Sequence, residues 1–147
     1  MPSTVTLHRV LATKPEKVYR AFIEPDAVAS WLPPYGYVCT VHHLDAKVGG
    51  THRMSFRNFT TGHSHSFGGV YKELVPGERL VYTDSFDDPN LPDEMTVSIT
   101  LKAVSVGTEM HIEQTGIPDI IPREACYLGW QDSLLKLAKL VEPEINQ

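Results

Sequence analysis

Two histidines one residue apart, His63 and His65 in GHSHSFGG, are the first residues in this chain whose spacing could do chemistry. Residues two apart share one face of a strand, so both imidazoles could bind a metal ion, with His52 as a third ligand. The flanking glycines favour the outer end of a hairpin instead, and no HExxH or Cys/His zinc spacing is present. We therefore predict no metal and no cofactor, and a rim or lid role for this loop, with Phe67 reaching toward a cavity mouth.

Alternation along the predicted strands places three polar residues on the same face as their apolar neighbours: His52, Asp84 and Gln114. A carboxylate among apolar side chains has a raised pKa, which suits it to proton transfer. The alternative is that Asp84 lies at a solvated rim, because it is close to the end of its strand. No G-x-S-x-G, P-loop or G-x-G-x-x-G pattern indicates a nucleophile or a nucleotide site, and no catalytic residue is assigned.

Apolar side chains on these faces and on the last helix complete the candidate ligand-binding set. The set is Trp31, Met54, Phe56, Phe67, Tyr82, Asp84, Val97, Ile99, Met110, Ile112, Gln114, Tyr127, Trp130 and Leu134. Tyr127 and Trp130 are three apart and are predicted to share the inner face of the helix, where Gly129 permits close backbone approach. At least half of the aromatic residues are expected to be plain core.

Strands and helices must position these residues, and turn signals divide the chain accordingly. The predicted strands are 4–12, 37–45, 51–58, 65–75, 79–86, 94–104 and 107–115. Residues 4–12 are predicted to be covered on both faces. Thr13 with Glu16 forms a capping-box pattern for a first short helix that ends near Pro25, and DAVASWL predicts a second. A long amphipathic helix runs from Pro122 to Pro143. One helix across a curved antiparallel sheet is an α+β fold with room for a cavity.

Length and composition indicate one globular domain over residues 1–147, of 41% hydrophobic and 21% charged residues. The formal net charge of −5 argues against nucleic acid and anionic lipid as partners. No signal peptide or apolar run long enough to span a membrane is evident, so we expect a cytoplasmic protein. Cys39 and Cys126 are expected to be reduced and partly buried.

Four segments in order resemble a known family: residues 9–34, from RVLATKPEKVYRAF to ASWLPP, then 68–84, 107–118 and 129–142. They are similar to the SRPBCC superfamily, also called START or birch-pollen-allergen-like, in its branch related to the activator of the heat-shock-protein-90 ATPase. The resemblance implies a helix-grip fold with an apolar cavity between the sheet and the C-terminal helix. The family often carries a bulky aromatic near Asp84 and a histidine near Gln114, so this chain departs at both.

The resemblance leaves three functions open, because members of the superfamily bind lipids, sterols, flavonoids or polyketides, act as cyclases or hydrolases, or assist a chaperone. We favour binding of a small hydrophobic or aromatic molecule over catalysis. Binding predicts saturable shifts of the NMR resonances that line the cavity, without turnover, whereas catalysis predicts a product. A chaperone partner, implied by the resemblance alone, predicts ATPase stimulation that is insensitive to cavity mutations.

Overall fold

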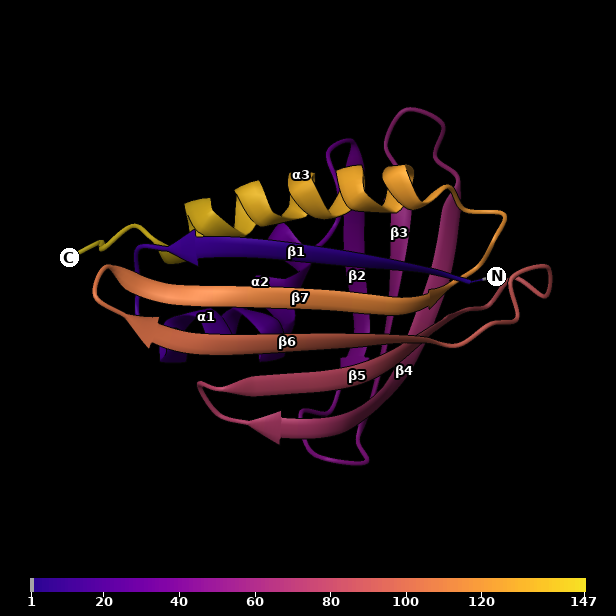
Figure 1. The fold of residues 1–147 in the computed structure, drawn as a ribbon. Coiled ribbons are helices and arrows are strands. Elements are labelled where there is room, and N and C mark those ends of the chain that lie inside the picture. Colours follow the sequence, from indigo (N-terminus) through magenta and orange to yellow (C-terminus); the bar gives the residue numbers. More distant parts are fainter. Residues whose placement is uncertain (1) are drawn as a thin grey trace.

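The computed structural model describes residues 2–147 as seven strands and three helices (Figure 1). In chain order these elements are β1 (Ser3–Leu11), α1 (Pro15–Ile23), α2 (Pro25–Trp31), β2 (Tyr37–Leu44), β3 (Thr51–Asn58), β4 (Ser64–Val75), β5 (Arg79–Phe86), β6 (Met95–Val104), β7 (Gly107–Ile117) and α3 (Arg123–Val141). All strands pair antiparallel in the order β1-β7-β6-β5-β4-β3-β2. The predicted α+β helix-grip fold is therefore confirmed.

Curvature of the sheet concentrates in β4, the longest strand, which bends between β3 and β5 (Figure 1). Two consecutive glycines permit the close backbone approach. A Cβ at Gly68 would lie 2.4 Å from the His52 carbonyl oxygen, and one at Gly69 would lie 1.9 Å from the Thr83 carbonyl oxygen. Any side chain would clash with a neighbouring strand at either position, so the bend requires glycine.

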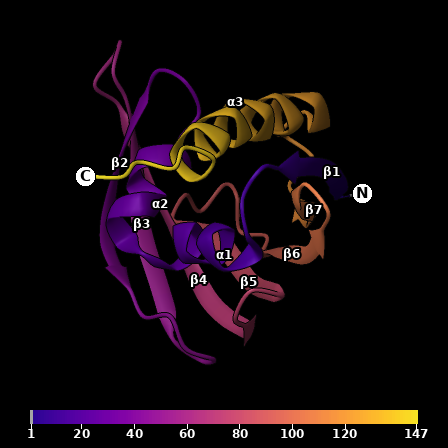
Figure 2. The same ribbon diagram turned by 90° about the vertical axis from the view of Figure 1, so that its left-hand side faces the viewer.

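Helix α3 covers the open side of the curved sheet, and α1 and α2 lie within the curve (Figure 2). The core-facing side of α3 is formed by Trp130, Ser133, Leu134, Leu137 and Val141, all buried. Pro122 precedes the helix as its N-cap, as the proline pattern predicted. A pocket lies between the sheet and the first turns of α3.

The start of α1 differs from the capping-box prediction. The N-cap is Lys14, without a side-chain capping bond, and Thr13 is buried. The Thr13 carbonyl accepts a hydrogen bond from Thr108 Oγ1 at 2.7 Å, so β7 engages this residue. Pro15 supplies the preset φ that begins the helix.

The prediction that the first strand is covered on both faces is wrong. Val5, Leu7 and Leu11 of β1 are buried, whereas His8 and Val10 on the other face are exposed. The sheet has only one covered face here, because α1, α2 and α3 all lie on its concave side (Figure 2). The outer face of β1 and β7 is consequently open to water.

Candidate functional site

A pocket of about 390 Å³, here called the large pocket, lies between strands β2–β7 and the beginning of α3. Its wall is mostly apolar and aromatic. Seven of the predicted ligand-binding residues line it: Phe56, Phe67, Tyr82, Asp84, Val97, Gln114 and Trp130. Its volume falls within the range of about 300–1,000 Å³ typical of small-molecule sites.

One wall of the large pocket is a run of small residues on α3. Ala125, Gly129 and Ser133 follow one another at four-residue intervals and all line the pocket. A Cβ at Gly129 would meet no atom within 4 Å. The expectation that Gly129 permits a close backbone approach is therefore wrong, because the glycine faces open space. A glycine inside a helix costs about 0.5–1 kcal/mol relative to alanine, and packing gives no reason for it here.

Gln114 of β7 is the polar centre of the opposite wall. Its Oε1 accepts hydrogen bonds from Trp130 Nε1 at 2.7 Å and from Cys126 Sγ at 3.3 Å. Its Nε2 donates to Met95 Sδ at 3.2 Å, and a thioether is a weak acceptor. The amide group thus fixes Trp130 in place and retains donor capacity for an acceptor atom in the pocket.

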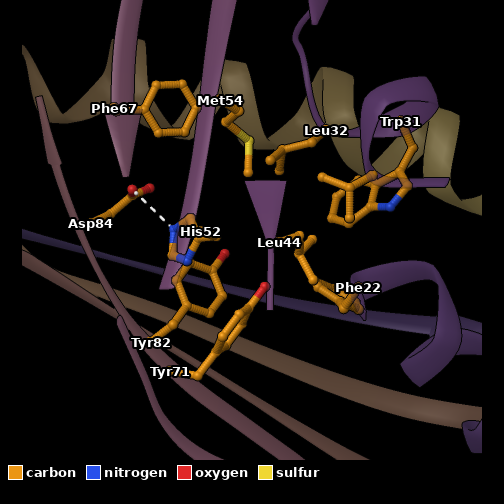
Figure 3. Close-up of a pocket in the computed structure, with 11 residues that line it drawn as sticks. Phe22, Trp31, Leu32, Leu44, His52, Met54, Phe67, Tyr71, Tyr82 and Asp84 are labelled. Atoms are coloured by element: carbon orange, nitrogen blue, oxygen red, sulfur yellow. Dashed lines mark hydrogen bonds and ion pairs between the residues drawn. The ribbon is translucent and has the colours of Figure 1, made fainter. Parts of the chain in front are cut away.

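Asp84 lines both the large pocket and a second hollow of about 30 Å³, here called the small pocket. Figure 3 shows its carboxylate facing His52, with Tyr71 and Tyr82 beside the imidazole ring. The distance from His52 Nε2 to Asp84 Oδ1 is 3.4 Å. Among the buried side-chain nitrogen and oxygen atoms of residues 2–147, His52 Nδ1 is the one without a hydrogen-bond partner. The small pocket has room for roughly two water molecules beside these groups.

Burial sets the charge state of the polar groups around the large pocket. Desolvation raises the pKa of the Asp84 carboxyl, although the hydrogen bond and charge of His52 act in the opposite direction. Burial also raises the pKa of Tyr82 well above its ordinary value, with Asp84 adding to the effect. Burial and the nearby His63 lower the pKa of His65. The site therefore favours neutral forms of its titratable groups.

We expect Asp84→Asn to stabilise the fold at neutral pH by about 1 kcal/mol, within the range common for such substitutions. Because the folded-state pKa of Asp84 lies above its ordinary 3.8, wild-type stability falls as pH rises from about 4 through the raised value. Asparagine cannot ionise, so its advantage should be present at pH 7 and vanish near pH 3.5. Thermal unfolding at both pH values measures it.

Asp93→Asn, at an exposed position, is the matched control and should change the melting temperature little at either pH. Destabilisation by Asp84→Asn at pH 7 would contradict the prediction. It would show that Asp84 and His52 are held as a charged pair whose attraction outweighs the desolvation of the carboxylate.

The other predicted residues divide between the small pocket, the core and the surface. Trp31, Met54 and His52 line the small pocket together with Phe67, Tyr82 and Asp84. Buried core positions that line neither pocket are Ile99, Met110, Ile112 and Leu134. Tyr127 is 36% exposed and lines neither pocket, so its predicted place on the inner face is wrong. Residues three apart are offset by about 60° around a helix, so Tyr127 lies at the solvent-exposed edge of the face that Trp130 and Leu137 bury.

Several lining residues were missing from the predicted set, and the same alternation could have found two of them. Phe86 follows Asp84 by two positions, and Met95 precedes Val97 by two; both line the large pocket. Tyr37 and Cys126 line it as well. The small-residue run on α3 was the other available signal.

The histidines of GHSHSFGG separate in the structure. His63 is exposed before β4 begins, whereas His65 is half-buried and lines the large pocket among Tyr37, Phe56, Phe67 and Phe86. His52, on the neighbouring strand, belongs to the small pocket. These three imidazoles do not form a common ligand set among the described residues.

A curved antiparallel sheet that grips a C-terminal helix defines the α+β helix-grip class. The chain belongs to the family described as Activator of Hsp90 ATPase homolog 1-like protein, whose model matches residues 12–142. The resemblance to the SRPBCC superfamily, and to this branch of it, is thereby confirmed. Comparison with curated proteins gives no match.

One solved structure is similar to this chain in sequence and fold, and two more distant ones share its fold. Protein CV1439 from Chromobacterium violaceum is 58% identical, with a TM-score of 0.96, over 98% of this chain and 100% of that chain. The AHSA1-like protein from Aeromonas hydrophila is 18% identical, with a TM-score of 0.78, over 99% of both chains. Protein NE0264 from Nitrosomonas europaea is 22% identical, with a TM-score of 0.77, over 93% of this chain and 92% of that chain. The last two share the fold.

Among residues 2–147, no helix is both long and apolar enough to cross a bilayer.

Proposed function

We propose that the protein binds a small, neutral, largely aromatic molecule in the large pocket. The observation that carries this proposal is the pocket of about 390 Å³ whose α3 wall includes Gly129, where a Cβ would meet no atom within 4 Å. Aromatic side chains from the sheet and from α3 supply flat apolar surfaces for a ring system. Asp84 and Gln114 supply the few polar contacts that would orient it.

The charges around the large pocket favour a neutral ligand over an anionic one. Among the described residues that line it, none is lysine or arginine, and the acidic side chain is Asp84. An ionised fatty-acid carboxylate placed here would lose its hydration without gaining a cation. A hydroxylated aromatic such as a flavonoid or polyketide can donate to Asp84 or His65 and accept from the Gln114 amide.

A ligand screen by thermal shift and by NMR tests the proposal. Saturation at about 100 times Kd stabilises the folded state by about 2.7 kcal/mol, which corresponds to a melting-temperature rise of about 5–10 °C. We expect this rise from flavonoids or aromatic polyketides, with NMR shifts centred on Trp130 and Phe86, and a smaller rise from fatty acids. No shift from any of these classes would contradict the proposal, and a response to fatty acids alone would contradict the neutral ligand.

A second candidate function, an enzyme of the cyclase or hydrolase kind, is favoured by the pairing of Asp84 with His52. A carboxyl of raised pKa with an adjacent imidazole is suited to moving a proton on a bound substrate. Conversion of a bound compound to product, lost in Asp84→Asn while binding persists, would favour this function. A chaperone partner rests on the family description alone.

A further inference from the structure

Two histidines and a glutamate meet on the outer face of the sheet, on the side away from both pockets. His8 of β1 and His111 of β7 are directly paired across the two strands. Glu109 lies two residues before His111 and therefore points to the same face. His8 is 50% exposed, His111 58% and Glu109 33%, so solvent and ions reach all three side chains.

The side-chain atoms of this cluster lie at distances suited to sharing one ion. His8 Nε2 is 2.9 Å from Glu109 Oε2, and His111 Nε2 is 3.8 Å from Glu109 Oε1. The two imidazole rings have centroids 4.6 Å apart, and one ligand atom from each residue can be chosen within 4.8 Å of the others. Ligands bonded to zinc at about 2.0–2.1 Å in a tetrahedron lie roughly 3.3 Å apart, so small side-chain rotations suffice.

We propose that His8, Glu109 and His111 form a binding site for a divalent transition-metal ion such as Zn²⁺. Two imidazoles and one carboxylate are a ligand set that zinc uses in proteins, with a fourth position left for water. Strand pairing holds both imidazoles on one face without the ion. Because β1 is the edge strand of the sheet, a bound ion would tie it to β7.

A hydrogen bond within the cluster and a neighbouring charge compete with the binding of an ion. In its absence Glu109 accepts a hydrogen bond from His8, which lowers the pKa of its carboxyl, and His111 and Lys102 act in the same direction. Lys102 of β6 is the register partner of Glu109. The ammonium group of Lys102 repels a metal cation, so Lys102→Gln should raise the affinity of the cluster for zinc. If the three residues only formed ion pairs between the strands, zinc affinity would show no such gain.

The test is a titration of the tag-free chain with ZnCl₂, followed by calorimetry, thermal shift and the histidine side-chain NMR signals. We expect one equivalent to bind, to raise the melting temperature by several degrees and to shift His8 and His111. His111→Gln and Glu109→Gln should each lower zinc affinity at least tenfold. CoCl₂ should give the visible d–d bands of a low-symmetry site, and these bands should be lost in His111→Gln.

His42→Gln and His43→Gln are the matched controls. Both histidines are exposed on β2, and their Nε2 atoms contact the hydroxyls of Ser55 and Thr51 rather than a carboxylate. These variants should leave zinc affinity unchanged. Zinc shifts spread equally over all seven histidines, or unchanged affinity in His111→Gln, would overturn the proposal; folding of that variant is checked by its apo melting temperature.

Discussion

Trp31→Ala is expected to destabilise the protein by about 3–5 kcal/mol, the range for removing a large aromatic from a packed core. Trp31 is 1% exposed and packs edge-on against Phe22, with ring centroids 4.8 Å apart. Its Nε1 donates to the Ala21 carbonyl at 2.7 Å, which joins α2 to α1. Alanine would leave a void and an unpaired carbonyl together. Thermal or urea unfolding measures the loss, which should lower the melting temperature by about 10 °C or more.

Two variants separate the causes of that loss. Trp31→Phe keeps an aromatic contact with Phe22 but removes the N–H donor, so it should fall between wild type and Trp31→Ala. Tyr35→Ala removes an aromatic side chain that is 52% exposed and should change stability by less than about 0.5 kcal/mol. A cost below about 1 kcal/mol for Trp31→Ala would mean that α1 and α2 are not held by this contact.

The fold was predictable because its signals are local and repeated. Strict alternation along β6 and β7 gave the buried series Val97, Ile99, Met110 and Ile112. Prolines marked the starts of α1, α2 and α3. Where one local signal stood alone, as in the capping-box pattern at Thr13, a long-range contact with Thr108 prevailed.

The pockets were predictable only in part. Alternation shows which face of the sheet a side chain lies on, but not whether that side chain lines a pocket or is packed in the core. Alternation along the strands placed Asp84, Gln114 and His52 on the inner face correctly. It gave the same assignment to Val97, which lines the large pocket, and to Ile99, which is packed core. The difference depends on how far the curved sheet diverges from α3, and that curvature is a property of the assembled strands.

The outer cluster could not be recognised from the sequence at all. His8 and Glu109 are about one hundred positions apart, and only the pairing of β1 with β7 brings them together. The first strand was also predicted to be covered on both faces, so an exposed His8 was not expected. Non-local strand pairing is the step that no local pattern supplies.

Gly129→Leu is expected to lower the affinity of the large pocket for its ligand by at least about tenfold while the protein remains folded. The position lies on the pocket-lining side of α3, and a side chain built there meets open space rather than packed atoms. Leucine is a good helix former, so the substitution should not weaken α3. Titration of an aromatic ligand found in the screen, with the melting temperature of the apo variant, gives both quantities.

Gly129→Ala is the matched control, since it changes helix propensity while adding one methyl group to the wall. It should raise stability by about 0.5–1 kcal/mol and reduce affinity much less than leucine does. If the leucine variant bound with wild-type affinity, the ligand would lie outside the large pocket. If Gly129→Ala destabilised the protein, glycine would be required by the backbone conformation of α3. A stabilised alanine variant beside a leucine variant that cannot bind would instead indicate that this glycine keeps the pocket open at the expense of helix stability.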